Sequence, residues 1–279
     1  MALHACGSDH GKEEKTLCWH VFSDEGVADH EYVNFRNHER IANKARALKL
    51  VSRNTTIPVP KLLDHGVLPD GRQYLITEYI HGILLSQLSS QGCLSPEGSN
   101  HTESTDSTPC GICRTQAYRN ALKLINGVVL PQLAELKSNE RGIEGFVMPP
   151  SWLSLGQPPW KGKQQWETLP LENNDYVFQH GDIAANNIIM DRQTLQVRAL
   201  IDWEFAGHFL EGTERWPGTL DASVYNRRGH QLAGAIAKYL PIDYLACYDQ
   251  WEDKAKLAEL IQNGELPAPD PLRKAYKRD

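Results

Sequence analysis

The chain has 279 residues, of which 41% are hydrophobic and 23% are charged. This composition supplies enough apolar side chains for a packed core and excludes a mainly disordered chain. The formal net charge of −6, without a dense run of Lys or Arg, argues against a broad nucleic-acid-binding surface. No apolar run reaches transmembrane length and the first residues lack the apolar core of a secretory signal, so we expect a cytoplasmic protein that binds neither nucleic acid nor membrane.

The first 80 residues predict a small, strand-rich unit. Residues 17–22 and 31–35 are rich in aromatic and β-branched residues, which is typical of two short strands joined by a polar turn. Residues 37–52 predict a helix that ends at the prolines of IPVP. The apolar positions of this helix recur at helical spacing: Ile41, Ala45, Leu48 and Val51. Residues 61–80 predict a β-hairpin with its turn at LPDGR.

The remaining residues, 81–279, predict a larger and mainly helical unit. Residues 87–115 are rich in Ser, Thr, Gly and Pro, which indicates a loop or a disordered insertion. Helical patterns follow at 117–136 and, in two pieces, over 230–264, with Gly264 as a C-cap and a frayed tail beyond it. A strand-rich front followed by a helical back predicts an α+β fold with two lobes.

Six cysteines are scattered along the chain, and we expect them to be reduced thiols. Two of them, Cys110 and Cys113, form a lone CxxC within the polar segment. A zinc site would need a second pair of ligands, which His101 alone does not supply. The sequence therefore does not predict a metal or redox site at these cysteines.

Two aspartates lie in apolar surroundings: Asp182 in FQHGDIAANNIIM and Asp202 in ALIDWEFAG. The apolar residues on both sides predict short buried strands, and a loop held between buried strands is rigid, as a catalytic carboxylate requires. Mg2+ prefers oxygen ligands, which Asp202 and the amide of Asn187 would supply, while Asp182 could orient or deprotonate a hydroxyl. The alternative is that both aspartates are turn and cap residues with satisfied side chains. The spacing of His, Asp, Asn and a second Asp, expected on two adjacent strands, favours the chemical role.

The segments HGDIAANN, at 180–187, and IDWEFAG, at 201–207, together resemble the aminoglycoside phosphotransferase and choline kinase-like family, a branch of the protein-kinase-like fold. The sequence of these segments is closest to that of fungal small-molecule phosphotransferase-like members. The resemblance extends to ALKLV with IPVPK, at 47–61, and to ITEYIHG, at 76–82. It implies an antiparallel-sheet N-lobe over residues 1–80 that binds nucleotide, and a larger, mainly helical C-lobe over 81–279 that carries the catalytic loop and the acceptor site.

The resemblance also implies an ATP- and Mg2+-dependent phosphotransferase that acts on a hydroxyl of a small molecule. Asp182 would position the acceptor hydroxyl, and Asn187 and Asp202 would bind Mg2+. His180 would be structural and fix the loop by hydrogen bonds. The hinge that touches adenine mainly through backbone groups would consist of Glu78, Tyr79 and Ile80. The residues rich in Trp and Pro between 152 and 166 would shape the acceptor pocket or simply pack in the core.

The front unit departs from the family pattern. In the family, a strand Lys reaches the phosphates and a helix Glu pairs with it, whereas the matching positions here read Asn34 and Lys44. Either Lys44 reaches the phosphates from the helix and replaces the strand Lys, or nucleotide binding is weakened or lost. The alternative function is therefore a degenerate kinase-like protein: a binding module or a repurposed enzyme. Gly7 and Gly11 offer a phosphate loop, but a flexible terminus is the favoured interpretation.

Overall fold

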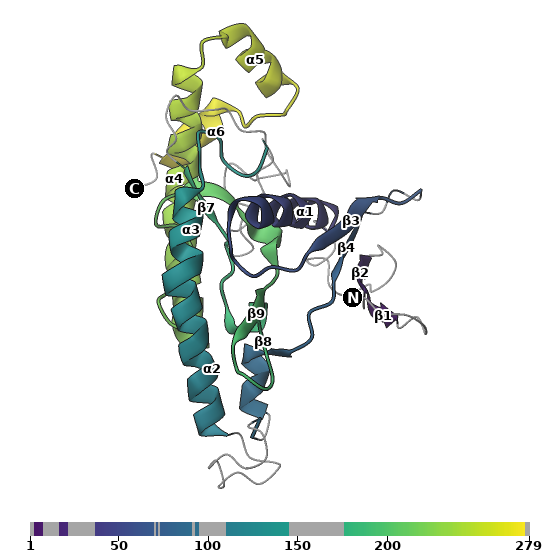
Figure 1. The fold of residues 1–279 in the computed structure, drawn as a ribbon. Coiled ribbons are helices and arrows are strands. Elements are labelled where there is room, and N and C mark those ends of the chain that lie inside the picture. The colour runs from purple at the N-terminus through teal and green to yellow at the C-terminus, as the bar shows by residue number, and fades with distance from the viewer. Residues whose placement is uncertain are drawn as a thin grey trace, which may run out of the picture.

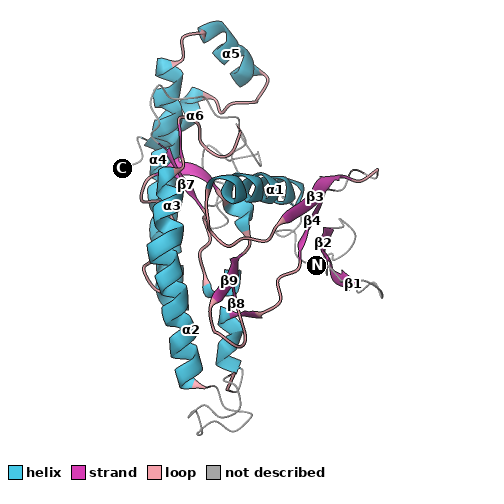
Figure 2. Ribbon diagram, in the orientation of Figure 1, coloured by secondary structure: helices cyan, strands magenta, loops and turns pink. Residues whose placement is uncertain are grey.

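The computed structural model of the protein describes these parts of the chain: residues 3–7, 17–21, 37–69, 71, 73–90, 93–94, 110–144 and 176–276. They form antiparallel sheets and helices, which confirms the predicted α+β class (Figures 1 and 2). Helices dominate the part of the chain that follows the first sheet (Figure 2). Within the described parts, no helix combines the length and the apolar character needed to span a bilayer.

The first four described strands of the chain form one antiparallel sheet with the strand order β1-β2-β4-β3. Its strands are β1 (Leu3–Gly7), β2 (Leu17–Val21), β3 (Leu62–Val67) and β4 (Gln73–Glu78). The strand expected at 17–22 and the hairpin expected at 61–80 are confirmed, whereas Asn34 and the strand expected at 31–35 lie outside the described residues. Gly7 was expected in a flexible terminus, but it ends strand β1 and pairs with Leu17, because strand pairing satisfies its backbone polar groups.

Helix α1 (Asn37–Asn54) lies between this sheet and the rest of the chain (Figure 1). The apolar stripe predicted from the sequence is buried: Ile41, Ala45, Leu48 and Val51. Thr55 donates from both its backbone N–H and its hydroxyl to the Val51 carbonyl, which closes the last turn before the prolines. One side of α1 contacts β3 and β4, and another contacts the 3-10 helix η4 (Trp203–Phe205). The helix therefore joins the small sheet to the segment that follows Asp202.

A long helical rod follows the polar insertion (Figure 1). It consists of α2 (Gly111–Leu124), one π-helical turn η2 (Ile125–Val129) and α3 (Leu130–Glu135). The wider turn precedes Pro131, whose missing N–H and ring do not fit a regular helix interior. The bounds predicted for the polar insertion, 87–115, are wrong at both ends, because the 3-10 helix η1 runs over Leu85–Ser90 and α2 begins at Gly111. The buried stripe of the rod begins before residue 117, where the predicted helical pattern starts: Cys113, Ala117, Ala121, Ile125, Val129 and Leu133.

Two three-stranded antiparallel sheets hold the two predicted aspartates. Their strand orders are β10-β7-β6 and β5-β8-β9. The strands are β5 (Ile83–Leu84), β6 (Lys137–Ser138), β7 (Tyr176–Gln179), β8 (Ile188–Met190), β9 (Val197–Leu200) and β10 (Gly207–Leu210). The strands expected around the motif are confirmed. Only β8 and β9 are adjacent, so the expectation that the whole motif lies on two adjacent strands is wrong: β7 belongs to the other sheet, and the segment after it connects the two.

Three helices end the chain: α4 (Ala222–Gln250), α5 (Lys254–Gln262) and α6 (Pro269–Tyr276). The side chain of Asp221 caps α4 by accepting from the backbone N–H groups of Ser223 and Val224. Gly264 has a φ of 71° directly after α5, the left-handed conformation expected of a C-terminal glycine. The frayed tail predicted after it is wrong, because α6 packs against α4 and buries Leu272 completely.

Candidate active site

Residues 180–187 run from β7 into the 3-10 helix η3 (Ala185–Asn187) and then into β8. The buried ring of His180 accepts at Nδ1 from the backbone N–H of Asp182, over 3.1 Å, and its Nε2 lies 3.0 Å from the carbonyl oxygen of Ile201. Burial lowers the pKa of His180, which favours a neutral ring that donates from Nε2. These are the hydrogen bonds that a structural role for His180 requires, and they tie the loop to the segment before Asp202.

Asp182 and Asn187 are joined by their own hydrogen bonds. The Asn187 amide nitrogen donates to the carbonyl oxygen of Asp182 over 2.8 Å and to its Oδ2 over 2.9 Å. The Asn187 Oδ1 accepts only from Asn186 Nδ2, over 3.2 Å, among the described hydrogen bonds. An amide oxygen has two lone pairs, so Oδ1 keeps one for a further partner such as a cation.

Asp202 follows β9 in a left-handed backbone conformation, with φ 69° and ψ 51°. Few non-glycine residues adopt this conformation, and such residues concentrate at functional sites. The backbone N–H of Ile201 donates to the Asn187 carbonyl over 2.9 Å, which holds the two segments together. The oxygen donors of Asn187 and Asp202 suit Mg2+, although Asp202 Oδ1 also lies 3.3 Å from Lys44 Nζ.

A cavity of about 420 Å³ lies beside this pair. All four residues expected to bind nucleotide line it together with Asp202: Lys44, Glu78, Tyr79 and Ile80. Asp182 and Asn187 do not line it, but the lining residue Ile201 donates its backbone N–H to the Asn187 carbonyl oxygen. The Glu78 side chain accepts from the backbone N–H of Lys61 over 2.9 Å, so it serves the IPVPK segment. At Gly82 a Cβ would lie 2.5 Å from the Met190 carbonyl oxygen, so glycine permits the close approach to β8.

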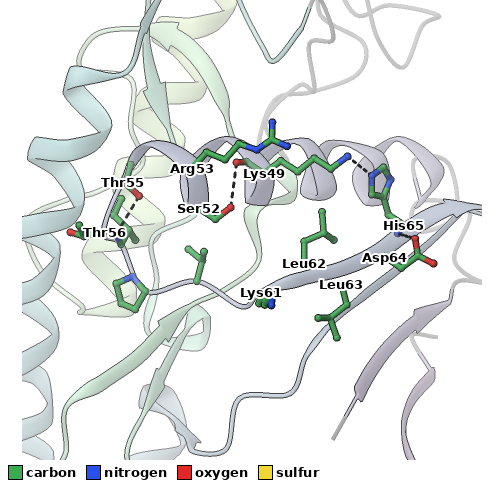
Figure 3. A pocket seen from close by; sticks show the side chains of 13 residues that line it. Lys49, Ser52, Arg53, Thr55, Thr56, Lys61, Leu62, Leu63, Asp64 and His65 are labelled. Carbon is green, nitrogen blue, oxygen red and sulfur yellow. Dashed lines mark hydrogen bonds between the residues drawn. The ribbon is translucent and has the colours of Figure 1, made fainter. Parts of the chain in front are cut away.

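A larger hollow of about 810 Å³ lies between the last turns of α1 and strand β3 (Figure 3). Three cationic side chains, Lys49, Arg53 and Lys61, are among its lining residues. Figure 3 shows Lys49 reaching His65, with 2.6 Å between Nζ and Nε2. Most of its lining residues are exposed, and no predicted catalytic or metal-binding residue is among them. The smaller cavity is therefore the candidate site.

Three residues that the sequence did not indicate contact the loop at 180–187. The Tyr225 hydroxyl donates to Asp182 Oδ1, and Arg215 Nη1 lies 3.6 Å from the same oxygen. The Arg215 guanidinium also lies 4.0 Å from the centre of the Tyr225 ring. Glu214 accepts from the backbone N–H groups of His180, over 2.7 Å, and Gly181, over 3.1 Å, and burial raises its pKa to about 7. No local pattern identifies these residues, because only the fold brings α4 and the segment after β10 to the loop.

Helix α1 is fixed to the segment after Asp202 by polar contacts. The buried Asn43 donates to the carbonyl oxygens of Glu204 and Ala206 over 2.9 and 2.8 Å. Arg40 forms an ion pair with Glu204, whose pKa is raised by burial. A sequence signal for this contact exists, because Asn43 is a polar residue between two apolar positions of the buried stripe. The contacts hold Lys44, the next residue along the helix, beside Asp202.

Comparison with known proteins gives one family match. The model of the phosphotransferase enzyme family matches residues 139–210. The matched segment contains Asp182, Asn187 and Asp202 but neither α1 nor the first sheet. No curated protein matches the chain.

Several solved structures are similar to the chain at low identity. A putative aminoglycoside phosphotransferase from Ralstonia eutropha is 14% identical, with 99% of this chain and 94% of that chain covered and a TM-score of 0.37. A thermostable mutant of aminoglycoside phosphotransferase APH(4)-Ia, in a ternary complex with ADP and hygromycin B, is 15% identical over 100% of this chain and 90% of that chain, with a TM-score of 0.40. An aminoglycoside 2'-phosphotransferase in complex with GDP is 10% identical over 97% and 91%, with a TM-score of 0.39.

Proposed function

We propose that the protein is a cytoplasmic, ATP- and Mg2+-dependent phosphotransferase of the aminoglycoside phosphotransferase-like type that acts on a hydroxyl of a small molecule. The proposal includes a protein-kinase-like division into an N-lobe at 1–80 and a C-lobe at 81–279. One observation carries it: a single cavity is lined by the hinge segment 78–80 and by Lys44 and Asp202. Its volume of about 420 Å³ falls within the range typical of small-molecule sites.

The cavity offers separate partners for a base and for phosphates. Apolar side chains line it for an adenine ring, among them Leu48, Ile83 and Trp203. Strand β4 pairs with β2 on one side and β3 on the other, and neither β2, LCWHV, nor β3, LLDHGV, contains a lysine. Lys44 therefore supplies the cationic group from α1, where Asn43 and the surrounding helix hold it. This supports the interpretation that Lys44 takes over the role of the strand Lys.

Asn187 and Asp202 are the residues that would hold Mg2+. When bound, the ion would neutralise charge on the nucleotide phosphates. Asn187 is suited to this role because its amide nitrogen is occupied by Asp182, which leaves its oxygen for the ion. Asp202 is suited because it follows β9 closely and its neighbour Ile201 donates a backbone hydrogen bond to the Asn187 carbonyl oxygen.

Asp182 is suited to orient an acceptor hydroxyl because it already accepts a hydrogen bond from one, that of Tyr225. A substrate hydroxyl would replace the Tyr225 hydroxyl at Oδ1. The acceptor oxygen would then form a bond to the γ-phosphorus, the bond from that phosphorus to the β,γ-bridging oxygen would break, and Asp182 would take the hydroxyl proton. Gly181 keeps the loop in place, because its φ is 81° and a Cβ there would lie 2.8 Å from the Phe205 carbonyl oxygen.

A second candidate function is a nucleotide-binding module that does not transfer phosphate. The observation in its favour is that both aspartates have partners within the chain. Asp182 contacts Tyr225 and Arg215, and Asp202 contacts Lys44. We prefer the first function, because Asn187 Oδ1 keeps a lone pair for a cation and the Tyr225 hydroxyl at Asp182 Oδ1 occupies the place that an acceptor hydroxyl would take.

The test uses the purified full chain. Calorimetry with ATP, with and without Mg2+, measures nucleotide binding, and ADP release in the presence of a panel of hydroxylated small molecules measures transfer. We expect Asp182→Asn to abolish transfer and to keep nucleotide binding. Asp191→Asn is the matched control, because Asp191 sits in the β8–β9 turn and bonds to Arg198 outside the cavity. Absence of nucleotide binding at millimolar ATP would refute both functions, whereas binding without transfer to any acceptor would favour the second.

A further inference from the structure

Three cysteines meet where the two ends of the polar insertion return to the core. Cys93 follows η1, Cys110 immediately precedes α2, and Cys113 lies in the first turn of α2. Their sulfur atoms all lie within 4.8 Å of one another, and the Sγ atoms of Cys93 and Cys113 are 3.8 Å apart. A disulfide would need about 2.05 Å between sulfurs, so no disulfide joins Cys93 to Cys113.

The spacing of the sulfurs matches a metal-thiolate site. Zinc binds thiolate sulfur at about 2.3 Å in tetrahedral geometry, so two sulfur ligands of one ion lie about 3.8 Å apart. The Cys93–Cys113 separation has this value, and the third sulfur is close enough to complete a face of the same tetrahedron. Three thiolates form a soft ligand set, which selects zinc or copper(I) over magnesium or calcium.

We propose that Cys93, Cys110 and Cys113 bind one zinc ion through their thiolates. The lone CxxC did not predict this site, because its third ligand lies on the other side of the insertion. Only the fold brings Cys93 to the start of α2.

The surroundings act in opposite directions on the two sulfurs of the CxxC. Hydrogen bonding from the backbone N–H of Cys113 lowers the pKa of the Cys110 thiol. The backbone N–H of Leu94 hydrogen-bonds to the Cys113 sulfur, although burial raises the pKa of Cys113 to about 11. Zinc would displace the three thiol protons, which pass to solvent, so affinity should fall as the pH is lowered. The N-terminal end of α2 also favours the net negative charge of a zinc ion with three thiolates.

The position of the cluster indicates a structural role. Cys110 and Cys113 are buried and belong to the main hydrophobic core, whereas Cys93 is half-buried at its edge. None of the three cysteines lines the proposed nucleotide cavity. A bound ion would join Cys93 to the first turn of α2, and a clamp between positions distant along the chain stabilises the fold by restricting the unfolded chain.

The test is metal analysis of the full chain, purified under reducing conditions without a metal-chelating column. We expect about one zinc per chain by mass spectrometry. Cobalt(II) exchanged into the protein should show thiolate-to-cobalt charge-transfer absorption and the strong visible bands of a tetrahedral site. The three cysteines should resist alkylation until a chelator is added. These measurements use the unchanged protein, so they decide the question even if a variant fails to fold.

Variants then locate the site. Cys93→Ser should lower zinc affinity by at least the roughly 10- to 100-fold that loss of an outer-shell partner costs. Cys247→Ala is the control, because this buried cysteine lies on α4 and should leave the metal content unchanged. Reduced protein that binds no stoichiometric metal would overturn the proposal. So would a Cys93–Cys113 disulfide in metal-free protein, or cobalt spectra without thiolate bands.

Discussion

Replacing Lys44 by methionine tests whether this lysine serves both the metal site and the nucleotide. The substitution removes the ammonium group and keeps most of the aliphatic stem. Lys44 Nζ lies 3.3 Å from Asp202 Oδ1, and the two side chains are 18% and 33% exposed. Without the ammonium group, Asp202 is free to bind a divalent cation, while the nucleotide phosphates lose a cationic partner. The same change should therefore strengthen one ligand and weaken the other.

The magnitude follows from the distance and the exposure. Two unit charges at this separation interact by about 1.3 kcal/mol in water and by about 5 kcal/mol at an effective dielectric constant near 20. Partly exposed pairs give about 0.2–1 kcal/mol when measured, because solvent screens them and the side chains lose entropy. We take about 1 kcal/mol, which corresponds to a change of about fivefold in a dissociation constant.

The assay is titration of nucleotide-free protein with Mn2+ as a magnetic probe for the Mg2+ site, followed by calorimetry with MgATP. We expect Lys44→Met to bind Mn2+ about fivefold more tightly and MgATP about fivefold more weakly. The control is Lys49→Met on the same helix, because Lys49 is exposed and contacts His65 instead. Unchanged affinity for both ligands in Lys44→Met would refute the reasoning, as would an equal effect of the control.

Three further outcomes are expected. Arg141→Met should lower the free energy of unfolding, measured with denaturant, by about 3–5 kcal/mol, because it leaves the Asp243 carboxylate buried without its partner at 2.8 Å. Burial raises the pKa of Glu214 from 4.5 to about 7, so the folded protein keeps a proton that the unfolded chain releases. The free energy of unfolding should therefore fall as the pH rises from about 4.5 to about 7. Glu214→Gln should remove this decline, as measured by denaturation at a series of pH values. Tyr225→Phe should lower the KM for the acceptor about fivefold and keep kcat, because a competing hydrogen bond to Asp182 worth about 1 kcal/mol is lost.

Each outcome has a result that would contradict it. Arg141→Met with unchanged stability would mean that the pair contributes no more than a surface ion pair. A Glu214→Gln profile with the same slope between pH 4.5 and 7 would place the pH dependence in another group. A higher KM in Tyr225→Phe would show that the Tyr225 hydroxyl binds the acceptor and does not compete with it.

Local patterns predicted those elements whose burial depends on one continuous segment. Periodicity identifies the stripe from Ile41 to Val51, the hairpin around LPDGR and the apolar residues beside HGD. Local patterns failed where burial depends on another element: the start of α2 at Gly111 and the helix α6 both appeared polar along the chain. In both cases the helix forms because it packs against another part of the folded chain.

The α+β class and the spacing of Asp182, Asn187 and Asp202 follow from short segments, so both could be predicted from the sequence. Which groups meet these side chains depends on how distant segments pack. Lys44 reaches Asp202 from α1, Tyr225 reaches Asp182 from α4, and Cys93 joins the CxxC across the insertion. Each of these contacts joins residues that are distant along the chain, and such contacts depend on how helices and sheets pack, which no local spacing records.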